Sequence, residues 1–427
     1  MRALFVTADL GGNVPPTLAV AEALTRHGTD DGVEVSVEVA GLGSGAGADA
    51  GALVHRVAFK PAEAIRPEGR NRGVREFGAF RRLLMSRDVS DATRALIAER
   101  RPDVVIVDGM LPAPLRGALD AGGVPVVTLL HTFGAFWVRS FDRGPMGRVF
   151  ATRGLRPSAL WARSADRLLL TDGELDPGEG DPALAGYHWT GTTEVGVDPA
   201  PRGDRPRILV SLSASEWPGM RPVYRRIVAA LAELPVDAIV TTGGVDLGGD
   251  IAGAANVEVR GWVAHADVLL PINPTADQRM IGGVIEAAGL GRRLPKSAGV
   301  SRIRATVAQM LDDTDLRERA AATGRRLRAA PAGADVAAAR ILTRGRRVRG
   351  FGCSRTSSGS GSNRCCLRTR GVVVTRSATT DGSLRGSRTG SVPGSRGATC
   401  LVSSSVPGRP CGSGTAAMPA MVPGIAC

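Results

Sequence analysis

Short apolar runs alternate with helical patterns in two consecutive blocks of this sequence. The runs Val104–Val107 and Pro125–Leu130 are uninterrupted, and each is followed by a polar residue, Asp108 and His131. A continuous apolar run of this length is typical of a parallel strand that is buried on both faces and carries its chemistry at the carboxyl end. The alternation of strand and helix therefore predicts an α/β fold with parallel sheets.

A polar, proline-rich linker at residues 198–206 separates the two blocks. We expect two Rossmann-like domains, 1–197 and 205–344, with a ligand bound where the carboxyl ends of both sheets meet. The expected strands are 3–7, 33–39, 104–107, 125–130, 207–212, 237–242 and 257–262. The expected helices are one after Pro15-Pro16, one over 75–101, one over 223–234, and helical patterning over 300–344.

The net charge of +13 comes mostly from the C-terminus. Residues 347–427 contain eleven Arg, one acidic residue (Asp381) and all six cysteines, whereas the first 346 residues are nearly neutral and free of cysteine. Helical and strand periodicity stop after Arg346, and the last 81 residues hold 14 Gly and 14 Ser. We expect 345–427 to be disordered, because such a composition cannot bury enough apolar area to offset its ordering entropy. The cysteine spacings, with Cys365 and Cys366 adjacent, fit no zinc pattern.

No apolar run approaches the ~18 residues that span a membrane. The N-terminus lacks the apolar core and cleavage site of a signal peptide. We therefore expect a cytoplasmic protein without a transmembrane segment, and peripheral contact with a membrane stays open.

The first strand leads into the turn Gly11-Gly12-Asn13-Val14-Pro15-Pro16 and then a helix. This junction resembles the first βα junction of nucleotide-sugar-dependent glycosyltransferases of the GT-B fold, in particular the actinobacterial enzymes of antibiotic and macrolide biosynthesis. The resemblance implies that Gly12 lies near the acceptor. A glycine-rich turn with a purely structural role is the alternative.

Many members of that family have His in this turn as the general base that deprotonates the acceptor. This chain has Asn13, and an amide cannot take a proton at neutral pH. Asp108 matches the family's Asp that orients the catalytic His. We prefer His131 as substitute base, because His titrates near physiological pH; a water held by Asn13 would assist it. A structural hydrogen-bonding role for His131 is the alternative.

The second half carries a further series of resemblances. Residues 209–215 resemble the strand and turn that open the family's donor domain, which implies that Ser213 and Ser215 face the pyrophosphate. Residues 257–263 resemble the segment whose Trp packs on the nucleotide base, here Trp262. Asp277-Gln278 matches the pair that hydrogen-bonds the sugar hydroxyls. The resemblance as a whole covers about residues 1–344.

Between Trp262 and Asp277 the sequence departs from the family. The turn that opens the pyrophosphate-binding helix is absent, and a βα unit of roughly 25–30 residues is missing from the pattern. We expect a second domain that lacks one βα unit and binds its donor poorly. The Arg-rich tail with its sudden cysteines has the composition of a GC-rich gene read out of frame, so we hypothesise a frameshift near Arg346.

The resemblance implies transfer of a hexose from a nucleoside diphosphate sugar to a hydroxyl of a small apolar acceptor, with inversion, no cofactor and no metal. Aromatic residues including Phe133 and Trp137 are expected at the acceptor, although packing between helices explains them equally well. Two other functions stay open: a binding protein without turnover, and nucleic-acid binding through the tail, which lacks the aromatic residues of a single-strand binder. An epimerase on the same fold is a weaker third.

Overall fold

The computed structural model describes residues 1–10, 12–42, 54–63, 72–194, 204–212, 219–242, 253–261, 276–348, 368–369 and 372–373. The first domain is built on a sheet of seven strands in the order β3-β2-β1-β4-β5-β6-β7, and every neighbouring pair is parallel. Its strands are β1 (Arg2–Val6), β2 (Ser36–Ala40), β3 (Val54–Val57), β4 (Val104–Asp108), β5 (Val126–Leu130), β6 (Asp166–Leu169) and β7 (His188–Trp189).

The sheet is covered on both faces. One face packs against α4 (Arg87–Arg100), α5 (Pro112–Ala121), α7 (Pro157–Arg163) and the π-helix η1 (Phe136–Asp142), together with part of α3 (Arg72–Met85). The other face packs against α1 (Val14–Asp30) and α12 (Gly333–Val348). This explains why β4 and β5 are buried at every position, as the uninterrupted apolar runs predict.

The expected single helix over 75–101 is wrong, because the chain breaks at Ser86 into α3 and α4. Ser86 is extended (ψ 142°), and its side chain accepts a hydrogen bond from the backbone N–H of Asp88. Serine at this position satisfies an N–H that the new helix leaves unpaired, so the residue starts a helix rather than continuing one. Smaller elements complete this region: α2 (Lys60–Glu63), α6 (Pro145–Ala151) and η2 (Pro182–Leu184).

The second domain has a sheet of three described strands in the order β10-β9-β8, all parallel. They are β8 (Arg207–Ser211), β9 (Asp237–Thr241) and β10 (Val257–Arg260), and the helices α8 (Met220–Ala232) and α10 (Val300–Asp312) share their apolar core. Tyr224 of α8 donates its hydroxyl to the carbonyl of Thr241 at 2.7 Å, and burial raises the pKa of this phenol to about 12. Residues 262–275, where the absent βα unit is predicted, lie outside the described residues.

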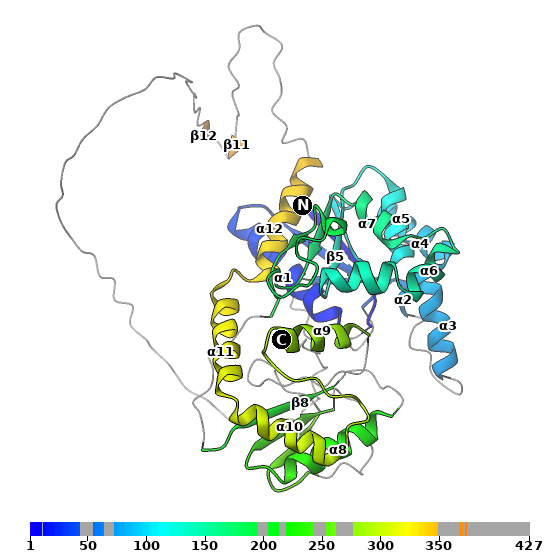
Figure 1. Cartoon of the computed structure of the whole chain (residues 1–427). Coiled ribbons are helices and arrows are strands. Elements are labelled where there is room, and N and C mark those ends of the chain that lie inside the picture. Colours follow the sequence, from blue (N-terminus) through cyan, green and yellow to red (C-terminus); the bar gives the residue numbers. More distant parts are fainter. Residues whose placement is uncertain are drawn as a thin grey trace, which may run out of the picture. The chain divides into compact units, whose positions relative to one another are not determined.

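The chain then continues through α9 (Ala276–Ala287) and α11 (Thr314–Ala329) to α12. Although α12 closes the second block of the sequence, it packs against α1 of the first domain, as Figure 1 shows. Arg340 and Arg344 of α12 both bind the buried carboxylate of Asp166 on β6, at 3.1 and 3.2 Å. Apolar burial and charge thus fasten the last helix to the first sheet.

Residues Phe351–Met418 form a separate unit. Its described part is the antiparallel pair β11 (Arg368–Thr369) and β12 (Val372–Val373). In the described part of the chain, none of the helices combines the length and apolarity needed to cross a bilayer.

Candidate functional site

Three polar side chains meet where the order of the first sheet reverses. Because β1 lies between β2 and β4, the carboxyl ends of β1 and β4 form the switch point at which α/β sheets bind ligands. Asn13 follows β1, Asp108 ends β4, and His131 follows β5. All three side chains are buried, with residue exposures of 5%, 3% and 7%. The structure therefore brings together the three residues that sequence analysis places at the catalytic position.

The amide of Asn13 faces inward instead of capping its helix. Its Nδ2 lies 2.7 Å from Oδ2 of Asp108, 2.8 Å from the carbonyl of Ala8 and 3.0 Å from Oγ1 of Thr7. Its Oδ1 accepts from the backbone N–H of Leu10 at 3.3 Å. An amide has two N–H groups, so three acceptors compete for them and hold the side chain in one orientation.

Asp108 is the centre of the cluster. Its Oδ1 accepts from the backbone N–H of Met110 at 2.9 Å, whereas Oδ2 faces both Asn13 and His131, with 3.4 Å to Nε2 of the imidazole. The hydroxyl of Thr17 on α1 lies 3.5 Å from the same Nε2 and donates to the carbonyl of Asn13 at 2.7 Å. The imidazole therefore turns Nε2 toward a carboxylate, which favours a proton on that nitrogen.

The other ring nitrogen of His131 has different surroundings. Nδ1 is buried, and no group among the described residues makes a hydrogen bond to it. When Nε2 carries the proton, Nδ1 has a free lone pair and acts as an acceptor. A buried acceptor without a partner costs stability.

Sequence analysis missed a second buried carboxylate, Asp176, which organises the loop after His131. Oδ1 and Oδ2 of Asp176 accept from the backbone N–H groups of Gly134, Ala135 and Gly178, and from the indole of Trp189 at 2.7 Å. The residue is 4% exposed. Because its donors come from three separate segments, no local spacing in the sequence announces it.

The predicted acceptor residues lie in different surroundings. Gly12 is exposed, and a side chain at this position would meet open space. Trp137 is 3% exposed and packs edge-on against Phe136, Phe141 and Trp161, at centroid distances of 5.3, 5.1 and 6.0 Å. The structure thus gives Trp137 a place in an aromatic core, and its contact with an acceptor stays a prediction.

Phe133 is 9% exposed and lies two residues after His131. Its carbonyl accepts from the backbone N–H groups of Phe136 and Trp137, which start η1. Phe133 thus joins the loop of the candidate base to the aromatic core. Contact between the Phe133 ring and an acceptor also stays a prediction.

The side chains of the predicted donor residues all lie outside the described part of the chain. Ser213, Ser215 and Trp262 lie outside the described residues, and so do the side chains of Asp277 and Gln278 in the first turn of α9. Among the residues that are described, no three His, Cys, Asp or Glu side chains gather as a metal site would require.

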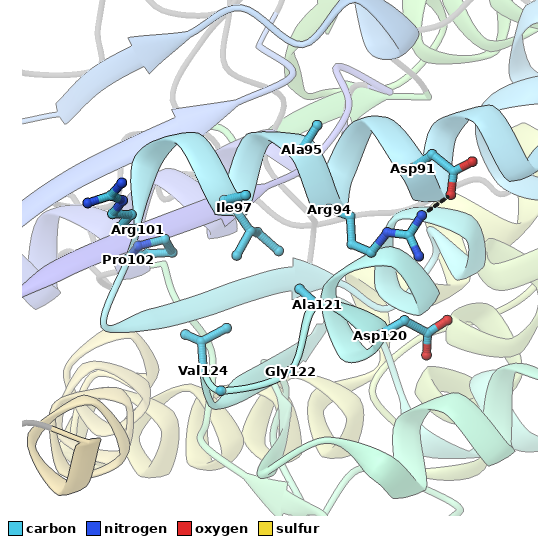
Figure 2. Close-up of a pocket in the computed structure, with 12 residues that line it drawn as sticks. Asp91, Arg94, Ala95, Ile97, Arg101, Pro102, Asp120, Ala121, Gly122 and Val124 are labelled. Atoms are coloured by element: carbon cyan, nitrogen blue, oxygen red, sulfur yellow. Dashed lines mark hydrogen bonds and ion pairs between the residues drawn. The ribbon is translucent and has the colours of Figure 1, made fainter.

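An open groove lies between α4 and α5 (Figure 2). Its lining includes Pro102 and Val124, which precede β4 and β5, so it opens at the edge of the sheet opposite the Asn13–Asp108–His131 cluster. Its carboxylates are neutralised: Asp91 pairs with Arg94 at 2.7 Å, and Asp120 pairs with Arg163 at 2.8 Å. We assign no ligand to this groove.

Neither a protein-family model nor a curated protein matches the sequence. Solved structures do match the fold. The structure resembles the glycosyltransferase of kitacinnamycin (TM-score 0.61, 20% identity, covering 80% of this chain and 98% of that one). It also resembles CalG4, the calicheamicin glycosyltransferase (TM-score 0.58, 19% identity, 81% and 98% covered). A third is the glycosyltransferase VinC in complex with dTDP (TM-score 0.52, 15% identity, 81% and 100% covered).

These similarities extend over nearly the full length of each solved enzyme and over about four fifths of the present chain. At identities of this size they establish the fold. The α/β fold predicted from the sequence is confirmed, and the chain has the GT-B architecture of the antibiotic glycosyltransferases.

Proposed function

We propose that this chain transfers a hexose from a nucleoside diphosphate sugar to a hydroxyl of a small apolar acceptor, with inversion. The observation that carries the proposal is the buried cluster of Asn13, Asp108 and His131 at the switch point of the first sheet. The structural comparison supports it, because the solved proteins described above are glycosyltransferases.

In the proposed reaction Nδ1 of His131 takes the proton of the acceptor hydroxyl. The acceptor oxygen bonds the anomeric carbon, the bond from that carbon to the diphosphate oxygen breaks, and the nucleoside diphosphate leaves. Asp108 holds Nε2 and stabilises the imidazolium that forms, as a carboxylate does for the base of a catalytic triad. Because Nδ1 is buried, its neighbours must shift when the acceptor binds.

The donor would be held by Ser213, Ser215, Trp262, Asp277 and Gln278. The complex of VinC with dTDP supports thymidine diphosphate as the leaving group, and the sequence resemblance leaves uridine diphosphate open as well. The departure of the sequence between Trp262 and Asp277 weakens this half of the site, since a missing βα unit takes a pyrophosphate-binding helix N-terminus with it. We therefore propose a donor affinity below that of an intact enzyme of this fold.

Asn13 favours a second candidate function. An amide at this position cannot act as a base, so the chain would bind donor and acceptor without turnover if Nδ1 of His131 never meets the acceptor. The two candidates differ in product formation and not in ligand binding.

The test is incubation of the full chain with dTDP-glucose or UDP-glucose and a panel of apolar phenols and macrolactones, followed by mass spectrometry. Glycosyl transfer adds one hexosyl unit, the mass of a hexose less one water, to an acceptor and releases one nucleoside diphosphate. Binding of both substrates, detected by ligand-observed NMR, without either product would favour the second candidate. Absence of binding and of product would contradict both.

A further inference from the structure

Helix α6 places apolar side chains in solvent. Among the large hydrophobic residues of the described chain, Met146 and Val149 are the exposed ones, at 40% and 45%. Their spacing of three residues puts them on one face of the helix. The neighbouring positions Gly147 and Phe150 are buried, and the Phe150 ring lies 5.3 Å from that of Phe141.

Exposed arginines flank this apolar pair in the sequence. Residues 143–163 contain five Arg and no acidic residue. A turn continues beyond Ala151 through the hydrogen bond from Arg153 N to the carbonyl of Phe150 (2.9 Å), so Arg153 directly follows the helix that carries the apolar pair. Four of these arginines are exposed, and no ion pair joins them to an acid in the described residues: Arg143, Arg148, Arg153 and Arg156. By contrast, Arg163 pairs with Asp120.

An apolar centre bordered by cations matches the surface of an anionic bilayer. Guanidinium groups bind lipid phosphates while short apolar side chains enter the boundary between headgroups and acyl chains. A stable protein interface buries about 800 Å² on each partner, far more than two side chains of a seven-residue helix supply. Charge complementarity and the small apolar area thus both favour a lipid surface over an acidic protein.

We propose that Arg143, Met146, Arg148, Val149, Arg153 and Arg156, here called the α6 surface, dock the chain on anionic lipid bilayers. The ring contacts Phe150–Phe141 and Phe141–Trp137 connect this surface to the aromatic core behind the loop of His131. Docking would place that aromatic core beside the lipid bilayer, in which apolar molecules concentrate. The inference does not depend on glycosyl transfer, and its test measures lipid binding alone.

The basic tail complicates any such test, because its eleven Arg attract anionic lipid without help from α6. The experiment therefore uses the full chain throughout, so that every variant has the same tail, and adds a local readout. Hydrogen exchange is followed in the segment 143–156, with vesicles of phosphatidylcholine alone and with vesicles of equal parts phosphatidylcholine and phosphatidylglycerol. Partition is measured by sedimentation with the mixed vesicles.

We expect slower exchange of 143–156 with the mixed vesicles only. The double variant M146S/V149S should lower the partition coefficient about tenfold, since it removes two apolar side chains from the boundary layer. R148Q/R153Q should lower it about tenfold at low salt. The matched control R325Q/R328Q removes two exposed charges from α11 and should change it less than about twofold.

Unchanged exchange of 143–156 on the mixed vesicles would overturn the proposal, and so would wild-type partition of M146S/V149S, which would assign adsorption to the tail. Protection of the segment by an acidic protein or by RNA but not by vesicles would overturn it as well. Thermal melts of each variant serve as the control for folding. We expect them to match the wild type, because the substituted side chains are exposed and their replacement leaves the core intact.

Discussion

Asn13 donates its side-chain amide to Asp108 across the switch point of the first sheet, with 2.7 Å between Nδ2 and Oδ2. The carboxylate that would orient a catalytic imidazole thus binds an amide, and the imidazole that does reach it, His131, approaches the same oxygen at 3.4 Å. In the proposed reaction Asp108 orients the imidazole and His131 accepts the proton, and substitutions can test these two roles separately.

The variant N13H places an imidazole beside Oδ2 of Asp108. In the background H131N, we expect N13H to restore product formation by at least about tenfold, because a positioned general base is worth about 10²–10⁴. The larger ring in a buried position costs about 1–3 kcal/mol of stability, so melts accompany the assay. N13Q is the matched control without a base. Equal rates for N13H/H131N and N13Q/H131N would show that Asp108 does not orient a base at this position.

Asp176 should be essential for the loop that follows His131. Replacement by Ala leaves the N–H groups of Gly134, Ala135 and Gly178 and the indole of Trp189 without their acceptor. We expect D176A to lower the free energy of unfolding by about 3–5 kcal/mol.

The neighbouring exposed acid provides the control for D176A. E179Q should change stability by less than about 0.5 kcal/mol. Urea unfolding followed by tryptophan fluorescence measures both variants. Similar midpoints for D176A and E179Q would mean that the hydrogen bonds of Asp176 add nothing to stability.

Helix α12 should stabilise the first domain although it lies far from that domain in sequence. Ile341 is fully buried in the core that α12 shares with α1 and β1. I341A should therefore cost about 2–5 kcal/mol, whereas L327A on the half-buried face of α11 should cost much less. Hydrogen exchange in α1 measures how far α12 stabilises α1, and it should become faster in I341A. Unchanged exchange in α1 of I341A would rule out this stabilising role.

His188 should make stability depend on pH. Burial lowers the pKa of its imidazole and Arg340 lowers it further, while Asp166 opposes the shift. The folded-state pKa is thus below the unfolded value of about 6.5, and the unfolded chain takes up the proton first. Stability should fall as pH decreases from about 6.5 toward the folded-state pKa, and above about 6.5 the residue contributes nothing. H188Q should lose less stability than wild type between about pH 7.5 and about pH 5. An equal loss in both proteins would contradict this assignment.

Much of the first sheet could be predicted from the sequence because its central strands are continuous apolar runs. β4 and β5 start and end within one residue of the predicted strands. Strands β3, β6 and β7 were not predicted, since Val54–Val57 and Asp166–Leu169 are half polar and His188–Trp189 has only two residues. The break at Ser86 escaped prediction because arginine and apolar residues continue at helical spacing on both sides of it.

The convergence of Asn13, Asp108 and His131 was predictable for a topological reason: each follows a parallel strand, and parallel strands end at one edge of a sheet. Thr17 and Asp176 were not predictable. Thr17 reaches Nε2 of His131 from the first turns of α1, and the donors to Asp176 span residues 134–189. Contacts between segments far apart in sequence leave no periodic pattern to recognise.

The most direct test of the proposed site is the rate of hexose transfer by the full chain and by H131N, measured by mass spectrometry with dTDP-glucose and UDP-glucose and the same acceptors. The account predicts product from the wild-type chain and a loss of about 10² or more in kcat for H131N, with the melting temperature little changed. Equal rates for H131N and wild type would contradict the assignment of His131 as the base. Complete absence of product from a folded wild-type chain that binds both substrates would contradict the transferase itself.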